Sequence, residues 1–127
     1  MLTETHVTVM VPVVDINRAE NFYKNNLGFK KKKTDPSGNV LLSAGDVEIG
    51  LYKGSKPPSS DHTVMTFEVN DVKKEIKELE GKGVKFENYT DPDFKTDADH
   101  ICRKNGEEAA WFKDSEGNIL CVHRYGH

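Results

Sequence analysis

The sequence has few cysteines, a single tryptophan, no excess of basic residues and no long apolar run. Its 127 residues include two cysteines and five prolines, and 18 Lys and Arg stand against 21 Asp and Glu, a formal net charge of −3. No stretch approaches the roughly 18 apolar residues of a membrane-spanning helix, and no basic segment precedes an apolar one. We therefore expect neither a membrane nor a nucleic-acid partner, and a cytoplasmic location is the default.

The two cysteines fall in apparent strands rather than in a motif. Cys102 and Cys121 lack CxxC spacing, so reduced, buried thiols are favoured over a disulfide. A chain of this length, with 35% apolar residues, suits one compact domain over residues 1–127 with a modest core.

The first half of the chain predicts a strand, a helix and three further strands. Residues 6–11 alternate between two sets of side chains, and Pro12 is expected to end this run. Asp15 is a typical N-cap for an amphipathic helix over residues 16–27, which stops at Gly28. Turn signals then separate three strands, predicted over residues 29–33, 39–43 and 47–52.

A linker rich in Gly, Ser and Pro follows, and the same order of elements then begins again. The chain divides into module one at 1–53, the linker at 54–61 and module two at 62–127. Module two predicts a strand over 62–69 and a helix over 72–81 capped by Asp71. Its later strands are predicted over residues 84–86, 101–104 and the two arms of a hairpin that turns at Asp114-Ser115-Glu116-Gly117.

The two halves form an internal repeat. Asp15 and Asp71 are 56 residues apart, and so are His6 and His62, so the helix caps and the first-strand histidines occupy equivalent places. Each half has the order βαβββ, in which one helix covers one face of the sheet and leaves the other face concave. A cavity between such faces is the natural functional site.

Three stretches carry a family resemblance over nearly the whole chain. They are Val-Pro-Val-Val-Asp-Ile-Asn-Arg-Ala-Glu-Asn-Phe-Tyr-Lys-Asn-Asn-Leu-Gly-Phe at 11–29, Phe-Glu-Val-Asn-Asp-Val at 67–72 and Trp-Phe-Lys-Asp-Ser-Glu-Gly-Asn-Ile-Leu at 111–120. They resemble the glyoxalase, bleomycin-resistance and extradiol-dioxygenase superfamily, also called the vicinal oxygen chelate superfamily, with Ser115 where a proline is usual. The resemblance implies the α+β glyoxalase/bleomycin-resistance/dihydroxybiphenyl dioxygenase fold, in which the concave mixed sheets of two βαβββ modules enclose a cavity, and a homodimer.

The metal-dependent members of this superfamily hold a divalent ion on the cavity faces of the first and last strands of each module. The resemblance places those ligand positions at Thr8, Gly50, Val64 and Cys121. None of these is a carboxylate or an imidazole, which a hard divalent ion needs. We therefore expect no metal cofactor at the usual site.

A displaced metal site is the alternative. Two residues before the usual ligand positions, on the same strand faces, the chain has His6, Glu48 and His62. Two imidazoles with a carboxylate suit a Zn, Ni, Mn or Fe ion. A one-residue gap in the first strand would instead put His6 on the family's own ligand position, still without three partners.

Several residues share the inward-facing parity of the strands and are predicted to line a ligand cavity. Together with Trp111 they are Thr8, Met10, Gly50, Tyr52, Val64, Thr66, Cys121 and His123. Trp111 either packs in the core or stacks on a flat ligand. Cys121 and His123 are neighbours on one strand face, but a nucleophilic pair needs a third group to orient the imidazole, so no catalytic residue is assigned.

Two charged stretches have two interpretations each. Lys30 to Lys33 either form an anion site or, as we favour, protect an edge strand with solvated charge. Residues 87–99 contain five acids and one lysine, and form either a solvated loop or a flap that places Tyr89 and Phe94 over the cavity. As a flap, this segment would favour a cationic ligand.

The leading hypothesis from the sequence is a protein that binds a small, partly aromatic or apolar organic molecule without the family's usual metal. One alternative is a metal-dependent lyase or isomerase of glyoxalase type that acts through His6, Glu48 and His62. Another is a resistance protein that sequesters an antibiotic. The sequence leaves open whether the chain is an enzyme.

Overall fold

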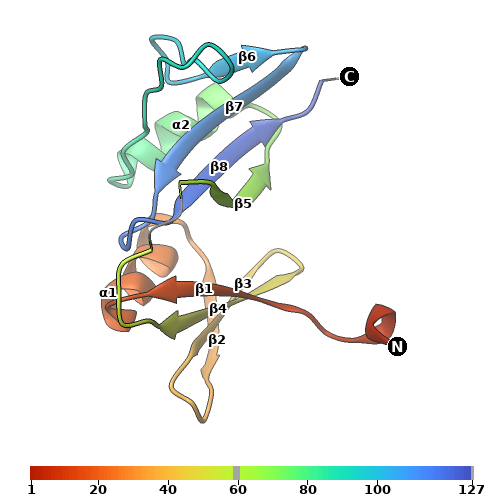
Figure 1. Ribbon diagram of the computed structural model, residues 1–127, viewed down its shortest axis with the longest axis vertical. Helices are drawn as coiled ribbons and strands as arrows, with labels where there is room; N and C mark the ends of the chain where they lie inside the picture. The colour runs from red at the N-terminus through yellow and green to blue at the C-terminus, as the bar shows by residue number, and fades with distance from the viewer. Residues whose placement is uncertain (59–60, 127) are drawn as a thin grey trace. The chain divides into compact units, whose positions relative to one another are not determined.

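The computed structural model describes residues 1–58 and 61–126, and the chain divides into two compact units after Pro58 (Figure 1). The division falls within the linker predicted at 54–61, of which residues 59 and 60 lie outside the described residues. Each unit contains one four-stranded mixed sheet and has the element order βαβββ. The fold class predicted from the repeat is therefore confirmed.

The first unit is built on a sheet with the strand order β1-β4-β3-β2, in which β1 runs parallel to β4 and the other pairs are antiparallel. In chain order it contains a 3-10 turn η1 (Leu2–Glu4), β1 (Thr8–Val13), α1 (Ile16–Asn21), a π-helical segment η2 (Phe22–Asn26), β2 (Lys30–Thr34), β3 (Val40–Ala44) and β4 (Val47–Lys53). The single helix predicted over 16–27 is thus an α-helix that continues into one π-helical segment. Asp15 is its N-cap, as predicted, and the Asp15 carboxylate accepts a hydrogen bond from Arg18 N at 3.0 Å.

The core of the first unit lies on one face of its sheet. Ala19 of α1 and Tyr23 of η2 are fully buried, and α1 contacts β4. The buried strand side chains on this face alternate along the chain and are Val11, Val13, Leu42, Ile49 and Leu51. Residues at the intervening positions therefore lie on the sheet face opposite α1.

Pro12 does not end the first strand, which corrects the expectation from the sequence. Strand β1 continues through Pro12, which lies opposite Tyr52, to Val13. Strand β1 lies at the edge of its sheet and has a partner on one side only. The nitrogen of Pro12, which carries no hydrogen, can therefore face away from β4, and no ladder hydrogen bond is lost. The strand begins at Thr8, so His6 precedes it.

The second unit repeats this plan with the strand order β5-β8-β7-β6, where β5 is parallel to β8. Its elements are β5 (Thr63–Glu68), α2 (Val72–Gly81), β6 (Cys102–Lys104), β7 (Glu107–Lys113) and β8 (Ile119–Arg124). Helix α2 has the predicted bounds, and its cap Asp71 accepts a hydrogen bond from Lys74 N at 3.1 Å. The strand predicted over 84–86 is reduced to one bridge between Phe86 and Phe112.

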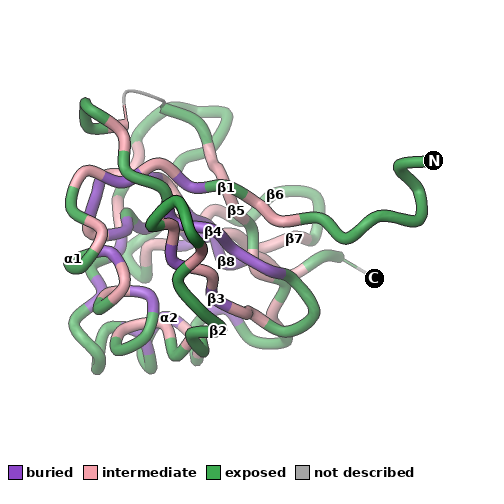
Figure 2. The backbone as a smooth tube through the Cα atoms, turned by 90° about the horizontal axis from the view of Figure 1, so that it is seen from below, coloured by how far each residue is buried: buried purple, intermediate pink, exposed green. Residues whose placement is uncertain are grey.

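The core of the second unit lies between α2 and the side of β7 and β8 that faces this helix. Buried and exposed stretches alternate along the chain (Figure 2). Its buried apolar side chains include Val72, Ile76, Leu79, Ala110, Phe112, Leu120 and Val122. Trp111, Cys121 and His123 alternate with these residues and therefore lie on the face opposite α2.

The predicted hairpin turn is held by an aspartate clamp. The Oδ1 atom of Asp114 accepts hydrogen bonds from Glu116 N and Asn118 N, each at 2.8 Å, and Asn118 Nδ2 donates to Asp114 Oδ2 at 2.8 Å. Gly117 adopts the positive φ of +98° that this turn requires. Asp35 and Asn39 form the same clamp between β2 and β3.

Within the described ranges, no helix combines the length and the apolar character needed to cross a bilayer. Cys102 and Cys121 are both free thiols, in agreement with the prediction of reduced cysteines. Cys121 is buried as predicted, whereas Cys102 is only partly buried, because it lies on β6, the last strand in the order β5-β8-β7-β6.

Candidate functional site

On the first sheet, the face opposite α1 carries the predicted cavity residues of module one. Thr8 lies opposite Glu48, and Met10 lies opposite Gly50 in the β1–β4 pair. A Cβ atom at Gly50 would lie 2.8 Å from the Met10 sulfur and 3.2 Å from Thr8 Cγ2. The Met10 side chain therefore occupies the space over Gly50, and a glycine permits this close approach.

Glu48 is the polar centre of this face. Its Oε2 accepts a hydrogen bond from the Thr8 hydroxyl and lies 2.9 Å from His6 Nε2, while its Oε1 lies 2.8 Å from Lys32 Nζ. The hydrogen bond from Lys32, and then those from Thr8 and His6, lower the pKa of the Glu48 carboxyl to about 2. The carboxylate therefore stays ionised throughout the physiological range.

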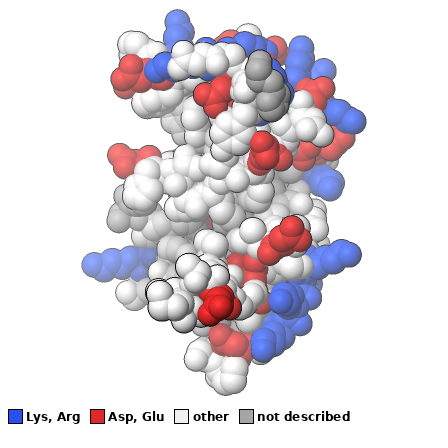
Figure 3. Space-filling model, turned by 90° about the vertical axis from the view of Figure 1, so that its right-hand side faces the viewer, with Lys and Arg blue, Asp and Glu red and all other residues white. Residues whose placement is uncertain are grey.

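Lys32 reaches Glu48 because β2 carries a bulge. Lys31 pairs with Leu42 and Lys33 with Leu41, so Lys32 has no partner in the strand ladder. The four lysines of β2 are exposed, as predicted for a charged edge strand, and basic side chains gather on one side of the first unit (Figure 3). Nothing in the spacing of these lysines along the chain indicates that one of them pairs with Glu48.

Two of the three residues of the proposed displaced metal site belong to the first unit. His6 and Glu48 are in contact, whereas His62 belongs to the second unit. Both Glu48 oxygens already have donors, and the Lys32 ammonium at 2.8 Å from Oε1 would repel a cation there. Across residues 1–58 and 61–126, no three His, Cys, Asp or Glu side chains are grouped to hold a metal ion. The displaced site stays a prediction, and no step of chemistry is assigned to it.

On the second sheet, the face opposite α2 carries Trp111, Cys121 and His123. Trp111 lies opposite Cys121, which also pairs with Thr66 of the parallel strand β5. Val64 sits at a register shift in β5, so that Thr63, which was not among the predicted cavity residues, lies opposite Ile119.

An aromatic cluster covers Trp111. The Tyr89 and Phe94 ring centroids lie 5.5 Å and 6.4 Å from the Trp111 centroid and 5.3 Å from each other, all in edge-to-face arrangements. A pocket of about 570 Å³ opens beside this cluster. Its lining consists of Asp61, His62, Thr63, Glu87, Tyr89, Phe94, Trp111, Lys113 and Ile119.

The segment 87–99 forms a folded flap over this sheet face. Glu87 N donates to the Trp111 carbonyl at 2.8 Å, which anchors the start of the segment. Tyr89 N donates to Thr96 Oγ1 at 2.8 Å, and Thr96 N donates to the Tyr89 carbonyl at 3.0 Å. Burial, followed by the nearby Glu87 charge, raises the pKa of the Tyr89 phenol above its usual value. These contacts fit the flap interpretation of this segment rather than that of a solvated loop.

The charged groups of the pocket are mainly acidic. Asp61 and Glu87 line it, and Lys113 Nζ lies 3.4 Å from Glu87 Oε1. Since Lys113 offsets one of the two acids, the pocket favours neutral or cationic molecules over anions.

Cys121 and His123 do not form a nucleophilic pair. The Cys121 thiol donates to the Val122 carbonyl at 3.4 Å, and burial raises its pKa to about 11. His123 Nε2 instead lies 3.2 Å from Glu107 Oε1. The imidazole therefore faces the Glu107 carboxylate, and the Cys121 thiol is not activated as a nucleophile.

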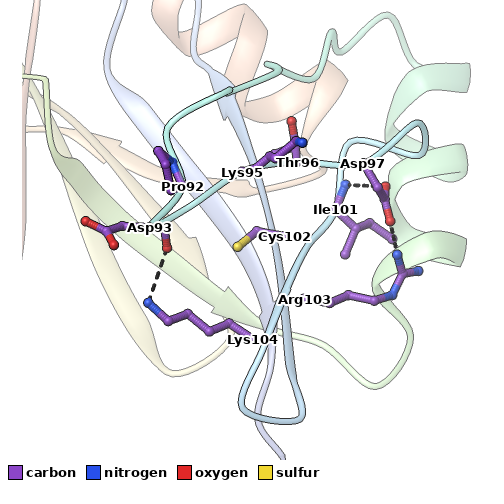
Figure 4. Close-up of a pocket in the computed structure, with 9 residues that line it drawn as sticks. All are labelled: Pro92, Asp93, Lys95, Thr96, Asp97, Ile101, Cys102, Arg103 and Lys104. Carbon is purple, nitrogen blue, oxygen red and sulfur yellow. Dashed lines mark hydrogen bonds and ion pairs between the residues drawn. The ribbon is translucent and has the colours of Figure 1, made fainter.

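A second pocket of about 430 Å³ lies between the flap and β6, and the Cys102 sulfur points into it (Figure 4). Two of its three cations have partners: Lys104 Nζ lies 3.4 Å from the Asp93 carbonyl, and Arg103 pairs with the Asp97 carboxylate. Asp97 Oδ1 also accepts a hydrogen bond from Ile101 N at 3.0 Å. These contacts hold the flap to β6, so the aromatic pocket is the stronger site for a ligand.

Comparison with solved structures gives the fold. TnmS3, an antibiotic binding protein from Streptomyces sp. CB03234, superposes with a TM-score of 0.73 at 19% identity, over 98% of each chain. A glyoxalase/bleomycin resistance protein/dioxygenase from Alicyclobacillus acidocaldarius gives a TM-score of 0.71 at 16% identity, over 96% of this chain and 92% of that one. Lactoylglutathione lyase from Agrobacterium tumefaciens gives 0.66 at 17% identity, over 95% and 93%.

None of the curated proteins matches the chain significantly. The family model described as the Glyoxalase/Bleomycin resistance protein/Dioxygenase superfamily matches residues 5–122. This match spans nearly the whole chain and agrees with two βαβββ units. The chain therefore belongs to the glyoxalase, bleomycin-resistance and dioxygenase superfamily.

Proposed function

We propose that this protein binds a small, planar aromatic molecule beside Trp111, without a resident metal. The observation that carries this proposal is the cluster of Tyr89, Phe94 and Trp111 on the rim of a pocket of about 570 Å³. A pocket of this size and lining is typical of sites for small organic ligands.

The chemistry of the pocket supports an aromatic ligand. Edge-to-face contacts between rings contribute about 0.5–1.5 kcal/mol beyond the burial of their area, and a bound planar ring can make such contacts with Trp111. Ile119 adds apolar surface, while Asp61 and Glu87 favour a ligand that is neutral or positively charged.

A structural relative supports a binding role. TnmS3 is an antibiotic binding protein, and its chain has the same fold over 98% of its length. By analogy, we propose sequestration of an antibiotic or a similar aromatic compound as the role of the site. The proposal predicts increased tolerance of the drug on expression, with the drug recovered unchanged.

The binding test uses the single tryptophan of the chain as its reporter. Planar aromatic compounds of each charge are titrated into the protein, and we expect saturable quenching of Trp111 emission by the neutral or cationic ones. Phe94→Ala should weaken binding several-fold, because one wall of the pocket is lost. Leu2→Ala, which shortens an apolar side chain that is 85% exposed on the first unit, is the control and should bind as the wild type does. If no compound quenches the emission saturably, the proposal is refuted, and loss of binding in the Leu2 variant alone would refute it as well.

A measurement of turnover distinguishes the glyoxalase-type alternative from a protein that only binds its ligand. A metal-dependent lyase or isomerase that acts through His6, Glu48 and His62 would convert a hemithioacetal and lose that activity on chelation. Turnover that persists after chelation would eliminate this mechanism, and absence of turnover beside saturable binding would support the binder.

We also propose that the protein is a homodimer in a cytoplasmic setting, as the family resemblance implies. Modules can pair within or between chains when a linker such as residues 54–61 joins them. Light scattering should give twice the mass of one chain, and a mass of one chain at all concentrations would refute the dimer.

A further inference from the structure

The three rings of the aromatic cluster stand nearly perpendicular to one another. The Tyr89 plane makes angles of 77° with Phe94 and 76° with Trp111, and the planes of Phe94 and Trp111 make an angle of 71°. All three rings line the pocket of about 570 Å³, which belongs to the second unit alone. Aromatic rings grouped around one cavity attract organic cations, because each ring face carries partial negative charge.

A carboxylate without a partner lines the same pocket. Asp61, which precedes β5, has neither a hydrogen bond nor an ion pair with any residue that the structure describes. Its side chain is exposed, so a molecule that enters the pocket can reach it. An ammonium group held by the rings can therefore pair with this carboxylate.

The other acid of the pocket already has a cation beside it. Lys113 Nζ lies 3.4 Å from Glu87 Oε1, and both residues line the pocket. Lys113 thus offsets Glu87 and leaves the charge of Asp61 without compensation. The ligand is the group that can supply this missing positive charge.

The charge of the whole second unit acts in the same direction. Acidic residues outnumber basic ones over residues 61–126, whereas basic residues outnumber acidic ones over residues 1–58. A cation is therefore attracted to the second unit from a distance, although salt screens this long-range part of the attraction.

We propose that the ligand of this pocket is an aromatic molecule with a positively charged amine, which contacts the aromatic cluster and pairs with Asp61. This inference rests on the proposed binding function and narrows its ligand class from neutral or cationic compounds to organic cations. Asp61 is the residue that selects for charge, and no bond is made or broken.

The experiment compares two probes that have the same ring system and differ in charge. Titration calorimetry is performed with 2-naphthylmethylamine and with 2-naphthylmethanol at pH 8, where a benzylic amine is protonated and an ordinary imidazole is neutral. Wild type should bind the amine about tenfold more tightly, because only the amine gains the contact with the ring faces and the pairing with Asp61. Asp61→Asn keeps the shape of the side chain and should reduce this preference about threefold.

Two further variants separate a local contact from the net charge of the unit. Lys113→Met removes the cation beside Glu87 and should increase the preference for the amine several-fold, a gain that a damaged fold does not produce. Glu78→Gln also removes one charge, but from an exposed position on α2, which covers the other face of the sheet. It should leave the preference unchanged.

A leucine variant tests the contribution of the rings. Phe94→Leu keeps apolar bulk at the rim of the pocket and removes one ring face. It should reduce the preference for the amine by more than it reduces the affinity for the alcohol. Equal weakening of the two probes would show that Phe94 supplies only apolar surface and would refute its contact with the cation.

The remaining outcomes separate this inference from the function on which it rests. If wild type binds both probes equally, selection for a cation is refuted and aromatic binding stands. A preference that is the same in wild type and Asp61→Asn, or that falls equally in Glu78→Gln, would refute the role of Asp61. If neither probe binds, the proposed function fails together with the inference.

Discussion

Lys32 Nζ lies 2.8 Å from Glu48 Oε1, although the two residues are 16 positions apart in the chain. The bulge in β2 makes this contact possible, because it takes Lys32 out of the strand ladder. With Thr8 and His6 on the other carboxylate oxygen, Glu48 anchors three segments of the first unit through one charged group. Its role in the structure is therefore to hold the sheet face together.

This arrangement should make stability depend on pH. The pKa of Glu48 falls from 4.5 to about 2 on folding, so the ionised carboxylate stabilises the folded protein above pH 4.5, and the contribution is lost as the pH falls toward 2. We expect Glu48→Gln to lower Tm by a few degrees at pH 7 and by clearly less at pH 3. Thermal unfolding followed by circular dichroism gives both values.

Lysine variants provide the control for this test. Lys32→Met removes the largest cause of the lowered pKa and should give the same pH dependence in weaker form. Lys33→Met changes a neighbour on the same exposed strand and should leave Tm within a degree or so of wild type. An equal loss of Tm at both pH values for Glu48→Gln would contradict the assignment.

Local signals in the sequence were sufficient for the fold. Asp15 and Asp71 cap their helices as predicted, because an N-cap depends only on residues within one turn. The clamp at Asp114 is local in the same sense. The 56-residue repeat then fixed the order of the elements, and the alternation of side chains placed Thr8, Met10 and Gly50 on one face.

The contacts of the candidate site depend on features that the sequence does not encode locally. Bulges at Lys32 and Val64 arise from the pairing of two strands, and each changes which side chains share a face. Pro12 continues its strand only because that strand lies at an edge. Glu107 meets His123 across a strand pair, so this contact had no signal in the spacing of either residue.

Metal binding at the displaced site has a direct test. Because Lys32 occupies one side of Glu48, we expect protein purified without chelator or affinity metal to contain far less than one equivalent of any divalent ion. Elemental analysis is followed by titration of wild type, His6→Ala and His62→Ala with Ni, Zn and Mn. Near-stoichiometric metal that is lost in both variants would establish the displaced site and favour glyoxalase-type chemistry.

The two thiols should differ in reactivity. Burial raises the pKa of Cys121 to about 11, so at pH 8 only on the order of one thiol in a thousand is the reactive thiolate. Cys102 is less buried and points into the pocket beside the flap (Figure 4). We expect iodoacetamide to label one cysteine at least tenfold faster than the other. Peptide mass analysis should identify Cys102, and loss of the fast phase in Cys121→Ser rather than Cys102→Ser would reverse the assignment.

The flap should shield Trp111 from solvent. Two variants distinguish whether ring packing or a hydrogen bond within the flap holds it in place. Phe94→Ala removes a ring that contacts Trp111, and Thr96→Val removes the hydroxyl that accepts from Tyr89 N at 2.8 Å. We expect both to shift Trp111 emission to longer wavelength and to cost about 1 kcal/mol of unfolding free energy. Leu2→Ala, at a side chain that is 85% exposed, is the control and should leave the emission unchanged. A shift in Phe94→Ala alone would mean that ring packing holds the flap, whereas no shift in either variant would show that the flap does not cover Trp111 in solution.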